Sequence, residues 1–136
     1  MLRVRWLGHV EYREAHDLQR RLFKASQDDH LLLLEHEHVF TGGPNADMSN
    51  LLTSPSALGA TYEQTDRGGD ITYHGPGQLT GYPVLSLAGR RGGGITETKA
   101  YVHQVEQVLL DALHDLGLED CGRIDRYPGV WVASTS

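Results

Sequence analysis

The residues best suited to chemistry lie in one glycine-rich stretch, residues 67–83, which reads Arg-Gly-Gly-Asp-Ile-Thr-Tyr-His-Gly-Pro-Gly-Gln-Leu-Thr-Gly-Tyr-Pro. Glycine lets the main chain approach a ligand closely, and the Gly-Pro-Gly at 75–77 forces a tight turn because proline fixes φ. The guanidinium of Arg67 and the imidazole of His74, beside accessible backbone amides, suit an anionic or carbonyl-bearing ligand. On composition alone, a purely structural hairpin is an equally good interpretation.

A candidate ligand site can be defined within this stretch. Strand-forming residues on both sides of the turn predict a hairpin-like turn on a sheet, with the site at its rim. The glycine spacing does not match a dinucleotide-binding loop, and a strand rather than a helix follows it, which argues against a phosphate loop. The predicted substrate-binding residues are Arg67, Gly68, Gly69, Asp70, Ile71, Thr72, Tyr73 and His74.

The whole stretch resembles, nearly residue for residue, the signature of the octanoyltransferases of lipoate biosynthesis (the lipoate biosynthesis protein B family). Three further segments are similar to the same family: residues 12–19 to its first-helix motif, 34–36 to its second-strand motif and 129–132 to a later strand. The resemblance therefore covers the chain from about Tyr12 to Val132. It implies the catalytic fold of the biotin and lipoate protein ligases.

The resemblance also implies the reaction and its participants. Family members move an octanoyl group from acyl carrier protein to a lysine of a lipoyl domain, in 2-oxoacid dehydrogenases or the glycine cleavage H protein, in the cytoplasm and without a cofactor. The site would then line a groove for a medium-length acyl chain, with the amides of Gly68, Gly69 and Gly75 holding the acyl carbonyl. Such partners are acidic and the chain has a net charge of −6, so docking needs a local basic patch. The candidates for that patch are Arg67, Arg90, Arg91, Lys99, Arg123 and Arg126.

The resemblance leaves the reacting groups of such an enzyme unassigned. Family members use a cysteine from a Pro-Cys-Gly motif and a lysine, and both follow the strand that residues 129–132 resemble. Cys121 precedes that strand and stands in Asp-Cys-Gly, and Lys99 does not match the family lysine, so neither is given a catalytic role. We therefore predict no catalytic residue in this chain, and we expect one octanoyltransferase-like domain, residues 1–136, that is incomplete at its C-terminal end.

Three functions stay open at this point. The chain can be a fragment of an octanoyltransferase, one half of a split enzyme, or a non-catalytic module that binds an acyl chain or an acyl carrier. Because no nucleophile is assigned, the chain alone is not expected to transfer octanoate. A lipoate ligase is a weaker alternative, because nothing in the sequence resembles an ATP-binding element.

Composition excludes several other classes. The 136 residues are 39% hydrophobic and 22% charged, as in ordinary globular proteins, and the net negative charge argues against a general nucleic-acid binder. No apolar run is long enough to predict a membrane span, and the N-terminus lacks the apolar core of a signal peptide. A single cysteine cannot form an internal disulfide and fits a cytoplasmic protein. His36 and His38 would share one face of a strand, but zinc needs three or four ligands, so no metal is expected.

Hydrophobic periodicity predicts the elements that position the site. We expect a mixed α/β (α+β) domain whose central sheet is flanked by helices over 11–26 and 95–116. The apolar run at 31–34 is typical of a strand buried on both faces, and further strands are predicted at 2–7, 61–65, 71–73, 79–87 and 127–132. Residues 41–56 read as a long loop. Both helices are expected to pack on the same sheet, the second through Val102, Val105, Leu109, Ala112, Leu113 and Leu116.

The last predicted strand, 127–132, is expected to place Trp131 and Val132 at a poorly covered sheet edge. Exposed edges can pair with a second copy, so this edge predicts dimers or aggregation.

Overall fold

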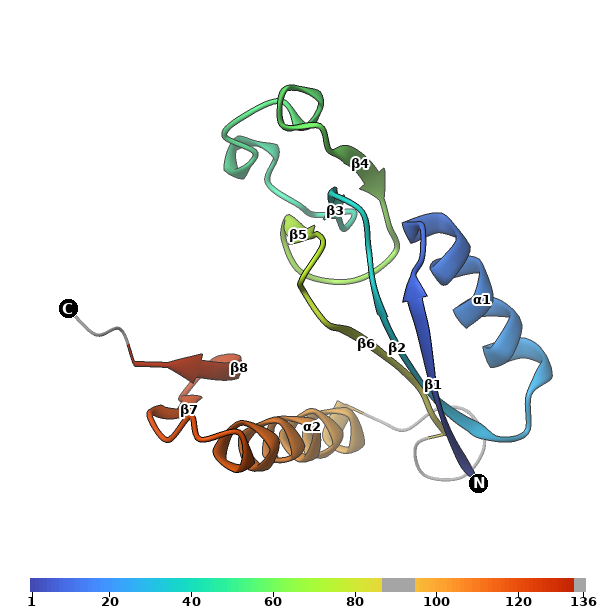
Figure 1. Cartoon of the computed structure of the whole chain (residues 1–136), viewed down its shortest axis with the longest axis vertical. Coiled ribbons are helices and arrows are strands. Elements are labelled where there is room, and N and C mark those ends of the chain that lie inside the picture. The colour runs from blue at the N-terminus through green and yellow to red at the C-terminus, as the bar shows by residue number, and fades with distance from the viewer. Residues whose placement is uncertain (87–94, 134–136) are drawn as a thin grey trace. The chain divides into compact units, whose positions relative to one another are not determined.

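The computed structural model describes residues 1–86 and 95–133, and it forms two compact units, Met1–Leu85 and Ser86–Ser136 (Figure 1). The first unit contains β1 (Leu2–His9), α1 (Tyr12–Ala25), β2 (Asp29–Glu35), β3 (Val39–Gly42), the 3-10 helices η1 (Met48–Asn50) and η2 (Pro55–Leu58), β4 (Thr61–Gln64), β5 (Thr72–His74) and β6 (Thr80–Val84). The second contains α2 (Ile95–Asp115), β7 (Cys121–Ile124) and β8 (Tyr127–Val132). The mixed α/β class is as predicted, and the single domain over the whole chain stays a prediction.

The first sheet of the first unit has the order β1-β2-β6, with β1 parallel and β6 antiparallel to the central β2. Successive side chains of a strand point to opposite faces, and in β2 Leu32 and Leu34 are fully buried whereas Leu31 and Leu33 are only partly covered. The continuous apolar run thus has one well-buried face, which corrects the prediction of a strand buried equally on both.

Helix α1 belongs to the first unit and has nearly the predicted bounds. The carboxylate of Glu11 caps its N-terminus by accepting hydrogen bonds from the amides of Arg13 and Glu14, both at 3.2 Å. Ala15, on the predicted apolar stripe, is fully buried, and the helix contacts β6. The three- and four-residue spacing of apolar side chains therefore predicted this helix correctly.

A second sheet has the order β4-β3-β5 and lies partly inside the predicted loop of residues 41–56. Strand β3 begins at Val39 and ends at Gly42, with β4 parallel and β5 antiparallel to it. The long predicted loop is therefore shorter than expected, because its first residues form the central strand of this sheet. The rest carries η1 and η2.

The predicted hairpin around the Gly-Pro-Gly turn is wrong. Strands β5 and β6 do not pair with each other: β5 pairs with β3 and β6 with β2. Leu34 pairs with Thr80, and Val39 pairs with His74. The five residue steps from Leu34 to Val39 therefore lie opposite the six steps from His74 to Thr80. The extra residue is accommodated where the turn interrupts the pairing, with the amide of Gln78 bonded to the carbonyl of Gly75 at 3.1 Å.

In the second unit, α2 packs on the antiparallel hairpin of β7 and β8. The helix and β8 have nearly the predicted bounds, and Gly117, with φ of +87°, ends the helix as predicted. The buried α2 side chains are Glu106 and Leu110, whereas Val102, Leu109 and Leu116 of the predicted stripe are exposed. Trp131 and Val132 are also exposed, as expected, while packing of both helices on one sheet stays a prediction. Within residues 1–86 and 95–133, no helix is long and apolar enough to cross a bilayer.

Candidate functional site

Arg67 uses its guanidinium to hold its own loop against β3. Nη2 donates to the backbone carbonyl of Thr41 at 2.8 Å, to the Thr41 hydroxyl at 2.8 Å and to the carbonyl of Asp70 at 2.9 Å. Nε reaches the same hydroxyl at 3.3 Å, and Nη1 donates to the carbonyl of Gly68 at 2.9 Å. Thr41 is fully buried, so the guanidinium connects the core of the second sheet to residues 67–70, which we call the signature loop.

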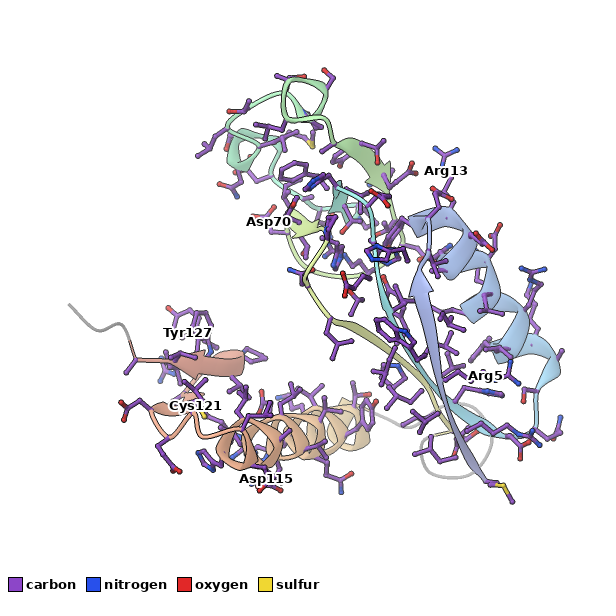
Figure 2. The ribbon with its side chains drawn as sticks, viewed as in Figure 1. Arg5, Arg13, Asp70, Asp115, Cys121 and Tyr127 are labelled. Atoms are coloured by element: carbon purple, nitrogen blue, oxygen red, sulfur yellow. The ribbon has the colours of Figure 1, made fainter. Side chains whose placement is uncertain are left out.

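Asp70 holds the other side of the loop and lies beside β5 (Figure 2). One carboxylate oxygen accepts hydrogen bonds from the amides of Ile71 at 2.7 Å and Asp47 at 2.9 Å, and the other accepts from the side-chain amide of Asn50. The backbone bonds from Ile71 and Asp47 hold the pKa of Asp70 below its usual value. Asp70 therefore ties the segment that includes η1 to the signature loop.

Glycines let these two segments come close together. A Cβ on Gly43 would overlap the carbonyl oxygen of Arg67, and one on Gly42 would overlap the hydroxyl of Tyr62. Gly69 has a φ of +88°, in the left-handed region that favours glycine. The amide hydrogens of Gly68 and Gly69 have no hydrogen-bond partner among the residues that the structure describes, so two donors in this loop are available.

Thr72 and Tyr73 are exposed on β5, and Ile71 just before it is partly buried. The hydroxyl of Tyr73 lies 2.5 Å from Nδ1 of His38, with the two rings stacked at 6.0 Å. A Cβ on Gly75 would overlap the Tyr73 hydroxyl, so the glycine after β5 makes room for this pair.

His74 lies in a cluster of four rings, which we call the ring cluster: Tyr12, His36, His74 and Tyr82. The imidazole of His74 stacks on Tyr12 at 6.2 Å and meets the His36 ring edge-on at 5.6 Å. Burial lowers the pKa of His74, so its neutral form is favoured at neutral pH. A neutral imidazole can accept a proton or a hydrogen bond from a ligand.

His36 is the fully buried member of the ring cluster, and both of its nitrogens have partners. Nδ1 lies 2.6 Å from the carbonyl of Val10, which can only accept, so Nδ1 carries the hydrogen. Nε2 then accepts from the Tyr82 hydroxyl at 2.8 Å. Burial raises the pKa of Tyr82, which keeps that hydroxyl protonated and donating. Sequence reasoning placed His36 in the family's second-strand motif and weighed it as a metal ligand, but it missed this structural role.

The structure thus brings the predicted site residues together in one loop and strand but gives them different partners. Arg67 and Asp70 bond within the protein, whereas Gly68, Gly69 and His74 keep unused donor or acceptor atoms. Four cavities lined by described residues do not include any of residues 67–74, and the predicted acyl groove stays a prediction. Among the described residues, no group of three His, Cys, Asp or Glu side chains could hold a metal ion.

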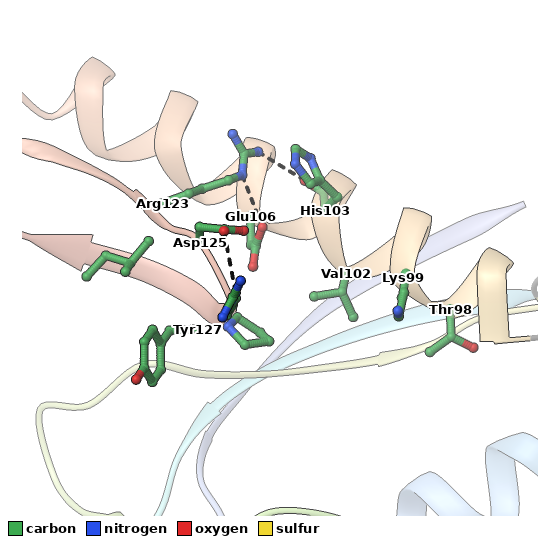
Figure 3. A pocket seen from close by; sticks show the side chains of 11 residues that line it. Thr98, Lys99, Val102, His103, Glu106, Arg123, Asp125 and Tyr127 are labelled. Atoms are coloured by element: carbon green, nitrogen blue, oxygen red, sulfur yellow. Dashed lines mark hydrogen bonds and ion pairs between the residues drawn. The ribbon is translucent and has the colours of Figure 1, made fainter.

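The second unit holds a cavity of about 670 Å³ between α2 and the β7–β8 hairpin (Figure 3). Three of the six cations predicted to form a basic patch line it: Lys99, Arg123 and Arg126. Arg123 is paired with Glu106 at 3.0 Å, and Glu106 also accepts from the amide of Gly129 at 2.7 Å. The remaining candidates are Arg67, which bonds within its own loop, and Arg90 and Arg91, which fall outside the described residues.

Cys121 lies at the start of β7, in the second unit (Figure 2). Its thiol donates to the carbonyl of Leu118 at 3.3 Å. That Cys121 has no catalytic role stays a prediction.

Comparison with known proteins bears on the family and the fold. Residues 11–135 match the model of a family described as lipoyl protein ligase A/B catalytic domain. An octanoyltransferase of Solibacter usitatus is 44% identical over 136 residues, covering 95% of this chain and 60% of that protein. Octanoyltransferases of Koribacter versatilis and Rubrobacter xylanophilus are 40% and 44% identical and cover 98% and 92% of this chain, with 55% and 57% of their own length matched. The chain therefore spans between about half and three fifths of the length of these relatives.

A solved structure supports the fold. Protein Ta0514 of T. acidophilum, assigned as a lipoate protein ligase and solved with bound lipoic acid, superposes with a TM-score of 0.66 at 13% sequence identity. The match covers 96% of this chain and 57% of that one. At this identity the likeness concerns the fold, which is the one that the signature led us to expect.

Proposed function

The chain belongs to the lipoyl protein ligase A/B catalytic-domain family, and on this basis we propose that it serves octanoyl transfer in lipoate biosynthesis. The reaction moves an octanoyl group from acyl carrier protein, in the cytoplasm, to a lysine of a lipoyl domain in a 2-oxoacid dehydrogenase or the glycine cleavage H protein. The observation that carries the proposal is the match over 91–99% of this chain to relatives named octanoyltransferase, at 37–44% identity.

Within that reaction, the signature loop binds and orients the acyl group. Gly68 and Gly69 offer two amide hydrogens for the thioester oxygen, where negative charge develops during attack on the carbonyl. Arg67 and Asp70 support this arrangement by fixing the loop from both sides. Ile71, Thr72, Tyr73 and His74 continue from the loop and line the path of the acyl chain.

We propose that no residue of this chain serves as the nucleophile of a covalent acyl intermediate. Cys121 is the single cysteine of the chain, and its thiol is engaged as a donor to a backbone carbonyl. Acyl transfer through a thioester enzyme requires a thiolate activated by a cation or base. We therefore propose that this chain contributes binding and orientation of the octanoyl group.

The test is a nuclear magnetic resonance titration of the ¹⁵N-labelled chain with the octanoyl thioester of N-acetylcysteamine. We expect the amide signals of Gly68 and Gly69 to move downfield as they bond to the carbonyl, while that of Gly117, at the end of α2, stays in place. The acetyl thioester is the matched control, because it has the same carbonyl without the long chain. Loop amides that do not respond to millimolar octanoyl thioester would contradict the proposal.

A transfer assay separates binding from chemistry. A lipoyl domain incubated with octanoyl-acyl carrier protein and this chain should gain no octanoyl mass at an enzymic rate. A mass gain that disappears in Cys121→Ser would show that Cys121 is the nucleophile after all.

A further inference from the structure

The two ring nitrogens of His74 have different surroundings. Nδ1 lies 3.0 Å from the side-chain oxygen of Gln78, while the side-chain nitrogen of Gln78 donates to the carbonyl of Tyr73 at 3.3 Å. That carbonyl can only accept, so the amide nitrogen must point to it and the amide oxygen must face the imidazole. Nδ1 therefore carries the hydrogen, and Nε2 keeps its lone pair.

This lone pair is accessible and unused. Nε2 of His74 has no hydrogen-bond partner in the described part of the chain, and it is not among the buried polar atoms that lack one. His36, in the same ring cluster, shows the contrast, because both of its nitrogens are bonded as expected for a structural histidine. A half-buried imidazole with one nitrogen fixed and the other free is instead suited to accept a hydrogen bond from a ligand.

The ring of His74 lies on the same face of the second sheet as the guanidinium of Arg67. Thr41 on β3 is paired with Thr72 on β5, so their side chains point to one face, and His74 shares that face because side chains alternate along a strand. Arg67 bonds to the Thr41 hydroxyl on this face. From Thr72 to His74 is about 7 Å along the strand. The imidazole thus stands beside the signature loop, whose amides are proposed to hold the thioester oxygen.

The groups around His74 favour its neutral form. Burial is the main cause that lowers the pKa of His74, and the bond to Gln78 opposes it. Positive charge on His36 or Arg67 lowers the pKa of His74 further. The two tyrosines of the ring cluster are not ionised near pH 7, because burial raises the pKa of both. Nε2 therefore keeps its lone pair at neutral pH.

The substrate proposed above offers few donors to this lone pair. The octanoyl chain and the thioester group have none, and the first N–H lies in the arm beyond the sulfur, in the secondary amide that follows a short methylene spacer. We propose that Nε2 of His74 accepts a hydrogen bond from this amide N–H and that Gln78 is the residue that positions the ring for it. The inference rests on the function proposed above. It makes His74 a specificity residue for acyl thioesters with an amide-bearing arm, and it adds no chemical step to binding and orientation.

The role of Gln78 can be tested without any substrate. The ¹⁵N chemical shifts of the His74 ring should show hydrogen on Nδ1 in the parent chain and a mixture of both tautomers in Gln78→Leu. Gln104→Leu, a change at an exposed α2 glutamine, is the matched control and should leave the His74 signals unchanged. A His74 ring that carries its hydrogen on Nε2 in the parent chain would overturn the proposal.

Recognition of the arm is tested with a matched pair of octanoyl thioesters. The thioester of N-acetylcysteamine has the N–H in its arm, whereas the thioester of 2-mercaptoethyl acetate has an ester oxygen in its place. Dissociation constants are taken from the amide signals of Gly68 and Gly69. We expect the ester-bearing compound to bind about 3–10-fold more weakly, because a single hydrogen bond is lost. The ¹⁵N signal of His74 Nε2 should move upfield with the amide-bearing compound and stay in place with the other.

Variants and pH test whether His74 is the acceptor. His74→Phe keeps a ring but has no lone pair, so both thioesters should bind to it equally. Gln78→Leu should retain only part of the preference, because a fraction of its His74 rings then carries hydrogen on Nε2. In the parent chain the preference should decline as pH falls below about 6.5, since an imidazolium has no lone pair. The last two measurements keep the test decisive if His74→Phe does not fold.

The outcomes separate the two proposals. Equal affinities of the parent chain for both thioesters at pH 7.5, or a preference that persists in His74→Phe, overturn the role of His74 and leave the binding function intact. Loop amides that respond to neither thioester overturn the proposed function, and recognition of the arm by His74 with it, although the tautomer of His74 would still be as described.

Discussion

Replacing Arg67 by lysine tests whether its guanidinium braces the loop or binds the ligand. The planar guanidinium reaches four acceptors at once: the Thr41 carbonyl and hydroxyl on β3, and the carbonyls of Gly68 and Asp70 in the loop. A lysine ammonium keeps the positive charge, but its three donors diverge from a single point and cannot serve both sides. The substitution therefore removes the connection and leaves the charge.

The size of the effect follows from these bonds. A hydrogen bond to a charged group contributes about 1.5–3 kcal/mol, and Arg67→Lys should lose about two of them net, partly replaced by water because the loop is exposed. We expect the free energy of unfolding to fall by about 2–4 kcal/mol. With a urea dependence of about 2 kcal/mol per molar, the unfolding midpoint should fall by about 1–2 M.

The assay is urea unfolding followed by the fluorescence of Trp6 on β1, in a Trp131→Phe background so that only the first unit reports. Arg13→Lys is the matched control, because Arg13 is exposed on α1 and its guanidinium forms a single surface ion pair with Glu63, at 2.8 Å, among the described residues (Figure 2). That variant should leave the midpoint unchanged. Equal midpoints for the two lysine variants would refute the bracing role. An unchanged midpoint with weaker octanoyl binding in Arg67→Lys would show instead that Arg67 contacts the ligand.

Three further predictions concern packing and protonation. Gly42→Ala should destabilise the first unit by about 1–3 kcal/mol in urea unfolding, because its Cβ would overlap the Tyr62 hydroxyl, and adding Tyr62→Phe should restore part of the loss. Burial lowers the pKa of His74 in the folded state, so the unfolded state binds more protons. The contribution of His74 to the free energy of unfolding should therefore decline as pH falls below about 6.5. His74→Phe should remove this contribution from the difference between the urea midpoints measured at pH 7.5 and at pH 5.5. Glu106→Gln should speed hydrogen exchange of the Gly129 amide, because a neutral amide oxygen is a weaker acceptor than the carboxylate that it replaces.

The elements that could be predicted from the sequence are those set by local patterns. Helix α1 and strand β8 have the expected bounds, because apolar spacing along the helix and β-branched or aromatic residues along the strand are decided within a few neighbouring residues. The position of the candidate site in the sequence could also be predicted, because residues 67–83 combine Arg67 and His74 with several glycines.

The arrangement of the site could not be predicted, because it depends on pairing between distant segments. Strand β3 has four residues, too few for a periodic pattern, and it exists because β4 and β5 hydrogen-bond to it from about 20 and 30 positions further along the chain. The role of Arg67 was hidden for the same reason. A guanidinium beside glycines suggests an anionic ligand, and only the position of Thr41 shows that the acceptors are carbonyl groups of the protein itself.

Hydrogen bonding divides the signature into a part that bonds within the protein and a part with unused donors, and the second part is the one proposed to face a ligand. Gly68 and Gly69 are exposed, so water can bond their amides in the free chain and a ligand oxygen can take the place of that water. The charged groups of Arg67 and Asp70 are engaged, while the amides of Gly68 and Gly69 and Nε2 of His74 have no hydrogen-bond partner within residues 1–86 and 95–133. Two neighbouring amide donors suit a carbonyl oxygen on which negative charge develops. An acyl thioester supplies such an oxygen, which is why the loop is proposed to bind and orient an octanoyl thioester.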